Sequence, residues 1–145
     1  MTLELRIVDQ SQIEDMLPFV MPYIERAVAY DSVGTVTTSS VLHDCFAGRS
    51  SLWIIYDRLK RLVGAVVTRL VAINPEERVL EISQFAIDAP REEWVPLFDV
   101  LDEWAQRLDC AGIEMIGRRG WRKVLPDLGF KEVQTIMRRK VFYGQ

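Results

Sequence analysis

The feature that most constrains the fold is the stretch from residue 79 to 130, where strands and helices alternate. Val79–Ile87 has the length and β-branched composition of a strand, and Asp88-Ala89-Pro90 ends it. Gly112 is predicted to end the helix that follows, and residues 113–116 form a short second strand. This order predicts a right-handed parallel pair. The helix is predicted from apolar side chains at helical spacing, namely Trp94, Leu97, Phe98, Leu101, Trp104, Ala105 and Leu108.

The flanking segments extend this unit into one α/β (α+β) domain that covers residues 1–145. Ser11 and Glu14 have the spacing of a capping box, and Pro18 and Pro22 are expected to kink or break the helix that follows. The complete predicted order is a strand at 3–8, helices at 13–28 and 38–46, antiparallel strands at 51–56, 62–73 and 79–87, then the unit above, a short helix at 121–128 and a last strand at 132–142.

Composition predicts a soluble protein, since 49% of the residues are hydrophobic and 27% are charged. No apolar run approaches the roughly 20 residues that span a bilayer, and the start lacks the basic residues of a signal peptide. Cys45 and Cys110 lie far apart and lack metal-ligand spacing, which favours a reduced, cytoplasmic setting. His43 is the single histidine, so no histidine-based metal site is predicted.

Charge is unevenly distributed along the chain. Residues 118–140, called here the basic segment, hold eight basic and two acidic residues, a net charge of +6 against −9 for the rest. This asymmetry predicts a surface for an anion or for an acidic protein partner, with an ordinary solvated basic face as the alternative. Nucleic acid fits less well because the whole chain is acidic. The candidate anion- or partner-binding residues are Arg118, Arg119, Arg122 and Lys123.

The element order and the Leu128-Gly129-Phe130 ending of the last helix resemble the GNAT superfamily of acyl-CoA-dependent N-acyltransferases. A narrower resemblance is to small GNAT-like proteins of tailed phages, in which Gly-Arg-Arg-Gly-Trp precedes such a helix, as at 117–121. The superfamily resemblance implies a GNAT-like mixed sheet and acetyl-CoA or CoA as a possible cofactor. It also implies that the pantetheine arm lies where two central strands splay apart, bound by the backbone of Phe85 and Ile87.

Several function-bearing positions depart from the pattern that this resemblance implies. Arg91 fits the first position of the family's diphosphate loop, but Trp94 and Pro96 replace its two small residues. Acidic residues 92 and 93 would also repel a diphosphate at that helix start. Leu125 stands where many members have a general-acid tyrosine, and Glu81 is the one weak candidate for a catalytic base.

Two functional hypotheses follow. The first, which the departures favour, is a GNAT-fold protein with an eroded donor loop and little or no catalysis. It would bind a protein partner through its basic segment, in the host cytoplasm or a virion if it is phage-encoded. The second is an acetyl-CoA-dependent N-acetyltransferase with a divergent donor site, in which Arg118 and Arg119 replace the missing loop. Oligomeric state does not follow from the sequence.

Overall fold

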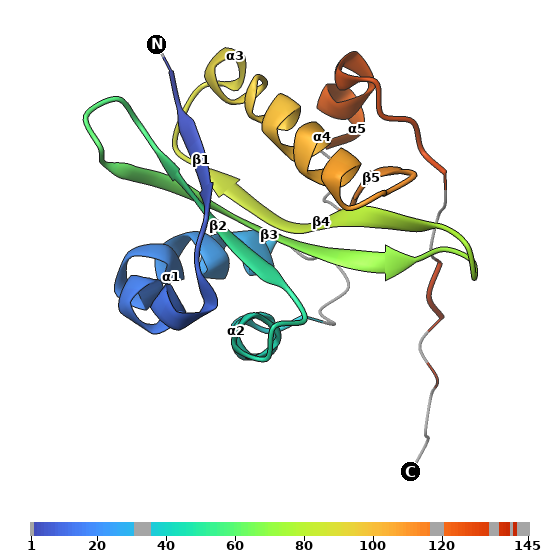
Figure 1. The fold of residues 1–145 in the computed structure, drawn as a ribbon, viewed down its shortest axis with the longest axis horizontal. Helices are drawn as coiled ribbons and strands as arrows, with labels where there is room; N and C mark the ends of the chain where they lie inside the picture. The colour runs from blue at the N-terminus through green and yellow to red at the C-terminus, as the bar shows by residue number, and fades with distance from the viewer. Residues whose placement is uncertain (1, 31–35, 117–120, 134–136, 140, 142–145) are drawn as a thin grey trace.

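A five-stranded mixed sheet forms the centre of the molecule, with helices on both faces (Figure 1). The computed structural model describes residues 2–30, 36–116, 121–133, 137–139 and 141. Strands β1 to β4 pair antiparallel in chain order, and β5 pairs parallel with β4. The strands are β1 Glu4–Ile7, β2 Ser51–Tyr56, β3 Leu62–Ala72, β4 Arg78–Ile87 and β5 Gly112–Met115. No helix among the described residues is both long and apolar enough to cross a membrane.

The helices divide into two groups that give the sheet two different cores. On one face, α1 and α2 cover mainly aliphatic side chains such as Val20, Ile24 and Leu52. On the other face, α3, α4 and α5 cover a core rich in aromatic rings, including Trp53, Phe85 and Trp94. The helix bounds are α1 Ile13–Ala29, α2 Thr38–Phe46, α3 Arg91–Trp94, α4 Leu97–Arg107 and α5 Trp121–Val124, with short 3₁₀ helices η1 Gln10–Gln12 and η2 Leu125–Leu128.

The start of α1 differs from the prediction. The predicted capping box does not form, because a 3₁₀ turn over 10–12 precedes α1 and Ser11 Oγ donates to Asp9 Oδ2 at 3.1 Å instead. A capping box forms at α2, where Ser40 N donates to Thr37 Oγ1 at 3.0 Å and Thr37 N donates to Ser40 Oγ at 3.1 Å. Thr-x-x-Ser makes the reciprocal bonds here although serine is shorter than the usual Glu or Gln.

The prolines of α1 do not break it. Pro18 and Pro22 both lie inside one continuous helix of 17 residues, although each removes a backbone donor. The apolar face explains this, because Val20 and Ile24 are fully buried against the sheet on either side of Pro22. Tertiary packing stabilises most protein helices more than local propensity does.

The predicted helix after β4 is split, and its end is not where the glycine lies. Pro96 separates α3 from α4 and is the N-cap residue of α4. At the other end, Asp109 adopts the left-handed conformation with φ of 55°, and Cys110 N returns to Ala105 O at 2.9 Å. Gly112 is therefore the first residue of β5 rather than the helix-ending glycine. Asn and Asp tolerate positive φ better than most residues, which explains why Asp109 can end the helix where a glycine was expected.

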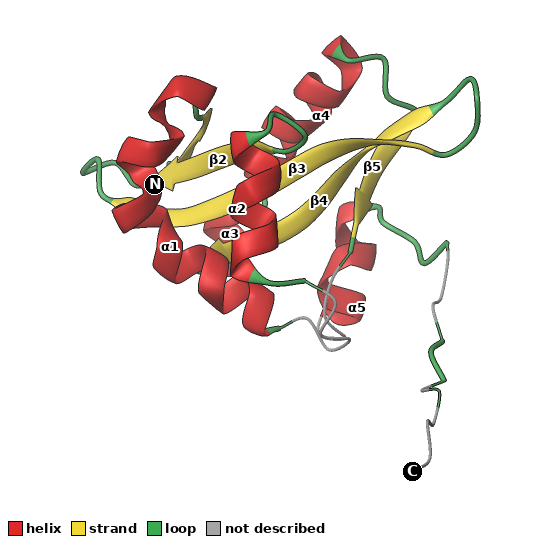
Figure 2. Cartoon of the chain, turned by 90° about the horizontal axis from the view of Figure 1, so that it is seen from below, coloured by secondary structure: helices red, strands yellow, loops and turns green. Residues whose placement is uncertain are grey.

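The chain after α5 corrects the prediction of a last strand. Helices α5 and η2 occupy the predicted 121–128 helix, and Gly129 ends it with φ of 87°. From 131 on, the described residues 131–133, 137–139 and 141 form no strand. They lead away from the sheet (Figures 1 and 2). The remaining residues of the predicted 132–142 strand lie outside the described part of the chain.

Candidate functional site

The candidate site lies where β4 and β5 separate. The two strands are paired from Val79↔Gly112 to Ile82↔Met115, and Ile116 N makes one further bond to Ile82 O at 3.3 Å. Beyond this point β4 continues to Ile87 with β3 as its neighbour, while β5 ends. Residues 117–120, which follow β5, lie outside the described part of the chain, so the splay between strands 82–87 and 113–116 stays a prediction.

A bulge in β4 sets which groups face the splay. The β3–β4 register shifts between Val67 and Thr68, so that Ser83 is the extra residue, and Ser83 Oγ donates to Val67 O at 3.2 Å. After the bulge, Asp88 N donates to Val63 O at 2.7 Å. Since backbone bonding alternates along an antiparallel pair, the peptide groups of Phe85 and Ile87 point away from β3 and toward the splay.

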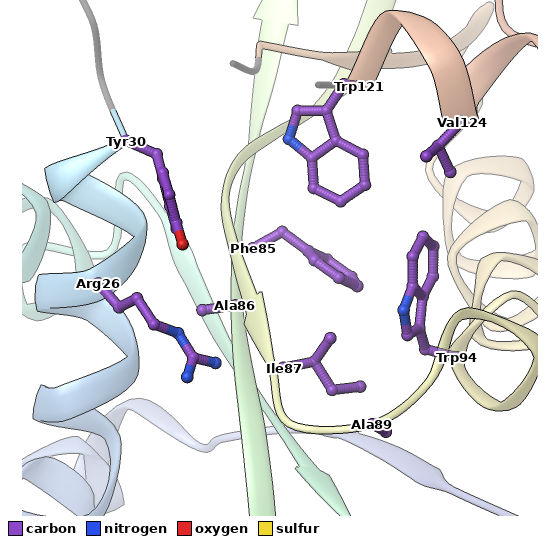
Figure 3. A pocket seen from close by; sticks show the side chains of 9 residues that line it. All are labelled: Arg26, Tyr30, Phe85, Ala86, Ile87, Ala89, Trp94, Trp121 and Val124. Atoms are coloured by element: carbon purple, nitrogen blue, oxygen red, sulfur yellow. The ribbon is translucent and has the colours of Figure 1, made fainter. Parts of the chain in front are cut away.

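A pocket of about 410 Å³ opens beside this part of β4 (Figure 3). One wall comes from α1 through Arg26 and Tyr30, and the opposite wall is aromatic (Figure 3). Ala86 points toward the α1 wall and Phe85 toward the aromatic wall, because neighbouring strand residues face opposite sides of a sheet. The lining residues are Arg26, Tyr30, Phe85, Ala86, Ile87, Ala89, Trp94, Trp121 and Val124.

The aromatic wall is a close-packed cluster rather than an open channel. The ring of Phe85 contacts Trp94 with a centroid distance of 5.4 Å and Trp121 at 5.6 Å, and the two tryptophans are 5.8 Å apart. All three pairs are edge-to-face, the arrangement that aromatic quadrupoles favour. Phe98 continues the cluster to Phe130 at 5.8 Å. The cluster thus joins the end of β4 to α3, α4 and α5.

A polar contact fixes the other side of the pocket. Asp88, just after β4, accepts from Arg26 Nη1 at 2.7 Å and from Tyr23 Oη at 3.0 Å. The Arg26 hydrogen bond is the main reason that the pKa of Asp88 lies below its usual value. Partial burial, followed by the neighbouring Asp88, raises the pKa of Tyr23. These contacts hold α1 against the end of β4 and pair the Arg26 guanidinium with the Asp88 carboxylate.

The start of α3 is closed by contacts within the protein. Arg91 Nη2 donates to Asp127 Oδ2 at 2.9 Å and to Val124 O at 3.4 Å, so this guanidinium ties α3 to η2. The amides of Glu93 and Trp94 both donate to Pro90 O, at 2.9 and 3.4 Å. Trp94 is only 7% exposed because its ring belongs to the aromatic cluster.

Glu81 lies in the paired half of β4 and not at the pocket. Its side chain is 5% exposed and accepts from Arg69 Nε at 2.7 Å. Its register partner on β5 is Glu114, so the two carboxylates project from the same face of the sheet. Glu81 is therefore held in an ion pair, away from the pocket that Phe85 and Ile87 line.

The remaining candidate residues are dispersed. Leu125 begins η2 and supplies a carbonyl to Phe130 N at 3.1 Å. His43 is exposed on α2, while Cys45 is 1% exposed and its pKa is raised to about 11 by burial, as expected of a core thiol. Among the residues that the structure describes, no group of three metal-ligand side chains lies together.

The basic cluster is described only in part. Arg118 and Arg119 lie outside the described residues, as does the side chain of Arg122, and Lys123 is exposed. Sequence reasoning missed the α1 wall, which is formed by Arg26 on α1 and by Tyr30 just after it, about 50 residues before β4 begins. Nothing local to that helix marks it, because both side chains acquire their place only when α1 packs on the sheet.

Comparison with solved structures identifies the class of fold. A ribosomal-protein-alanine N-acetyltransferase from Brucella melitensis biovar Abortus 2308 superposes with a TM-score of 0.68 at 13% identity, covering 97% of this chain and 100% of that chain. An aminoglycoside acetyltransferase from an uncultured soil metagenomic sample, solved with sisomicin, gives 0.70 at 7% identity, covering 97% and 96%.

A predicted acetyltransferase from Clostridium acetobutylicum, solved with acetyl-CoA, gives a TM-score of 0.65 at 13% identity, covering 96% of each chain. No protein-family model and no curated protein matches the sequence. This chain has the GNAT fold, which confirms the predicted α+β class and the resemblance at the level of fold.

Proposed function

We propose that this chain is a GNAT-fold protein that has lost the diphosphate cradle of an acyl-CoA enzyme and has weak or no acyltransferase activity. In this proposal it acts by binding a protein partner through the basic segment. The observation that supports it best is the closed start of α3, where Arg91 is bound to Asp127 and Trp94 is built into the aromatic cluster.

Hydrogen-bond donors and charge decide whether this helix start can bind a diphosphate. A helix start binds a diphosphate through unpaired amides and the positive end of the helix dipole. Here Pro96 has no amide hydrogen, the amides of Glu93 and Trp94 already donate to Pro90 O, and two acidic side chains stand in the first turn. Those acids stabilise the helix by roughly 0.3–1 kcal/mol each and repel a bound anion.

A second candidate, an acetyl-CoA-dependent N-acetyltransferase with a divergent donor site, is favoured by the splay. The peptide groups of Phe85 and Ile87 face a pocket at the place where the resemblance implies that the pantetheine arm lies. In that case Arg118 and Arg119 would supply the diphosphate contacts, and Glu81 would have to leave its ion pair with Arg69 to act as a base.

Calorimetric titration of acetyl-CoA, CoA and pantetheine separates the two candidates. If the cradle is lost, CoA binds no tighter than pantetheine, because its diphosphate adds no favourable contact. Micromolar CoA binding, at least about tenfold tighter than pantetheine, would contradict the proposal, since tenfold corresponds to about 1.4 kcal/mol of diphosphate contacts. Loss of that binding in the Arg118→Ala/Arg119→Ala variant, but not in an Arg58→Ala/Lys60→Ala control, would establish the second candidate.

The partner-binding part has its own test. Reversing Arg118 and Arg119 to Glu is expected to abolish assembly with an acidic partner and to leave thermal stability nearly unchanged. Because the narrower resemblance is to phage proteins, the proposal includes a virion component as the partner. Co-sedimentation of the chain with purified particles, with and without the charge reversal, tests this, and unaltered assembly would contradict a role for the basic segment.

A further inference from the structure

We propose that the pocket beside the end of β4 anchors the protein partner, and that it takes one aromatic side chain from an extended segment whose neighbouring residues are acidic. This inference rests on the proposed partner-binding role of the basic segment, because it gives that partner a chemical identity. In this proposal the pocket supplies specificity for the aromatic group, and the basic segment attracts the acidic residues beside it.

The pocket has two unlike walls, and this is the first observation. Its volume of about 410 Å³ lies within the range of roughly 300–1,000 Å³ that is usual for ligand pockets. Figure 3 shows Phe85, Trp94 and Trp121 on one side and Arg26 on the other. Edge-to-face ring contacts and cation–π contacts both add to the burial of an aromatic group, whereas an aliphatic group gains neither. The pair of walls therefore favours an aromatic ligand.

Arg26 is already held in place for such a contact. Its Nη1 donates to Asp88 Oδ1 at 2.7 Å, and its guanidinium carbon lies 5.2 Å from the centroid of the Tyr23 ring. These two contacts orient the guanidinium before a ligand enters, which reduces the conformational entropy lost on binding. A guanidinium stacks well on aromatic rings because it is planar and weakly hydrated. The wall formed by Arg26 is thus suited to a flat ring.

The backbone of β4 offers hydrogen bonds along the same pocket. Phe85 and Ile87 occupy the non-hydrogen-bonded positions of the β3–β4 pair, so their peptide groups face away from β3. Among the residues that the structure describes, no other backbone group bonds to them from that side. An extended peptide binds to such groups as an added strand does, and its side chains alternate in direction. One side chain then enters the pocket while its neighbours point elsewhere.

The charge beside the pocket predicts what those neighbours are. Trp121 and Val124 line the pocket and also belong to the basic segment, so the two surfaces are continuous. Lys123 lies between them on α5, is exposed, and has no ion-pair partner within the described ranges of the chain. An acidic residue next to the anchored ring would find this ammonium group, and complementary charge raises the rate of association.

Carboxylates near the pocket set the orientation of the segment. Asp88 and Asp127 are each paired with an arginine, so they repel an acidic ligand only weakly. Glu92 and Glu93, in the first turn of α3, have no such pairing in the described part of the chain. They disfavour acidic groups on the α3 side of the pocket. The acidic residues of the partner are therefore expected on the α5 side.

Calorimetric titration of two blocked peptides into the full chain tests the proposal. Each peptide has one phenylalanine, with three aspartates either before or after it, so that both strand directions are covered. Micromolar binding of at least one peptide is expected. The peptides contain no tryptophan, so a shift in protein emission reports on Trp94 and Trp121 in the pocket. Replacing the phenylalanine by leucine, or the aspartates by asparagines, is expected to weaken binding at least about tenfold each.

Two protein variants separate the pocket from the charge. Ala89→Phe fills the pocket with a ring of its own and is expected to weaken peptide binding at least about tenfold, whereas Ala111→Phe, at an exposed position before β5, should leave it unchanged. Lys123→Gln is expected to weaken binding about two- to fivefold and to reduce its salt dependence. Lys60→Gln, in the β2–β3 turn, is the matched control. The peptide replacements keep the test decisive if Ala89→Phe fails to fold.

Three results would overturn the proposal. Binding that depends on the aspartates and on Lys123, but not on the phenylalanine or on Ala89, would mean that the basic segment works without the pocket; the proposed function would then stand. Binding of pantetheine but of neither peptide at millimolar concentration would assign the pocket to an acyl-donor arm. Binding of none of these probes would mean that the pocket has no ligand of either kind.

Discussion

The two halves of β4 show how one strand serves two different purposes. From 79 to 82 it lies between β3 and β5, and its one carboxylate, Glu81, is buried against Arg69. From 84 to 87 its one strand neighbour among the described residues is β3, and aromatic rings and a pocket lie on the other side. The bulge at Ser83 separates the halves.

The difference between the two halves shows that backbone pairing, rather than side-chain type, decides where a ligand-binding pocket can form along β4. Both halves are apolar in sequence and buried in the structure. Within the described part of the chain, only the second half presents peptide groups to a space without a neighbouring strand, and backbone groups there must find a partner in water, side chains or a ligand. In this chain an aromatic cluster fills part of that space, which reduces what a ligand can occupy.

Removing Trp94 is expected to have the largest effect on this arrangement. Trp94→Ala deletes the ring that joins Phe85, Phe98 and Trp121, and its side chain is 7% exposed. The expected loss of unfolding free energy is about 3–5 kcal/mol, the usual range for a buried tryptophan. Chemical denaturation measures it, and a loss under about 1 kcal/mol would mean that the cluster is not a packed core.

The second-largest effect is expected when the Arg69–Glu81 ion pair in the first half of β4 is broken. Arg69→Met keeps the aliphatic stem but leaves the Glu81 carboxylate buried without its 2.7 Å partner. We expect a loss of about 1–3 kcal/mol in unfolding free energy. Adding Glu81→Gln should recover part of it in a double-mutant cycle, because a neutral amide is less costly to bury. Strictly additive losses would contradict the coupling.

A larger side chain on β3, opposite the second half of β4, is expected to lower the unfolding free energy by a similar or smaller amount. A Cβ at Gly64 would lie 2.7 Å from the backbone oxygen of Ala86 and 3.1 Å from Ile87 Cα, so Gly64→Ala forces β3 and β4 apart. The expected loss is about 1–3 kcal/mol, typical of overpacking. Gly112→Ala is the control, since nothing lies within 4 Å of its Cβ position.

The smallest expected effect is at the end of the second half. Asp88→Asn removes the ion pair with Arg26, and we expect a loss of less than about 1 kcal/mol because both side chains are partly exposed. The lowered pKa of Asp88 means that its contribution is complete at neutral pH and disappears as pH falls below the ordinary value of 3.8. Thermal unfolding of both proteins across that range should therefore converge in acid, and a constant difference would contradict the assignment.

Much of the architecture follows from local patterns. The bounds of α2 and β2 agree with the prediction, and Asn74 turns the chain between β3 and β4 by accepting from the amides of Glu76 and Glu77. The errors lie where local rules compete with packing. Pro18 and Pro22 were expected to kink or break a helix, and the buried face of α1 keeps that helix continuous; Gly112 was assigned a role that Asp109 performs.

The sequence by itself determined the order of the strands and most helices as far as η2, the presence of Trp94 and Pro96 after β4, and the charge asymmetry, since these depend on residue type and spacing. The tertiary structure alone decided that the pairing of β4 with β5 ends at Ile82, that Arg26 and Tyr30 line one pocket together with Phe85, and that Arg91 binds Asp127. These relations join residues far apart in sequence, and side chains at such separations acquire a common neighbourhood only when the sheet and its helices pack together.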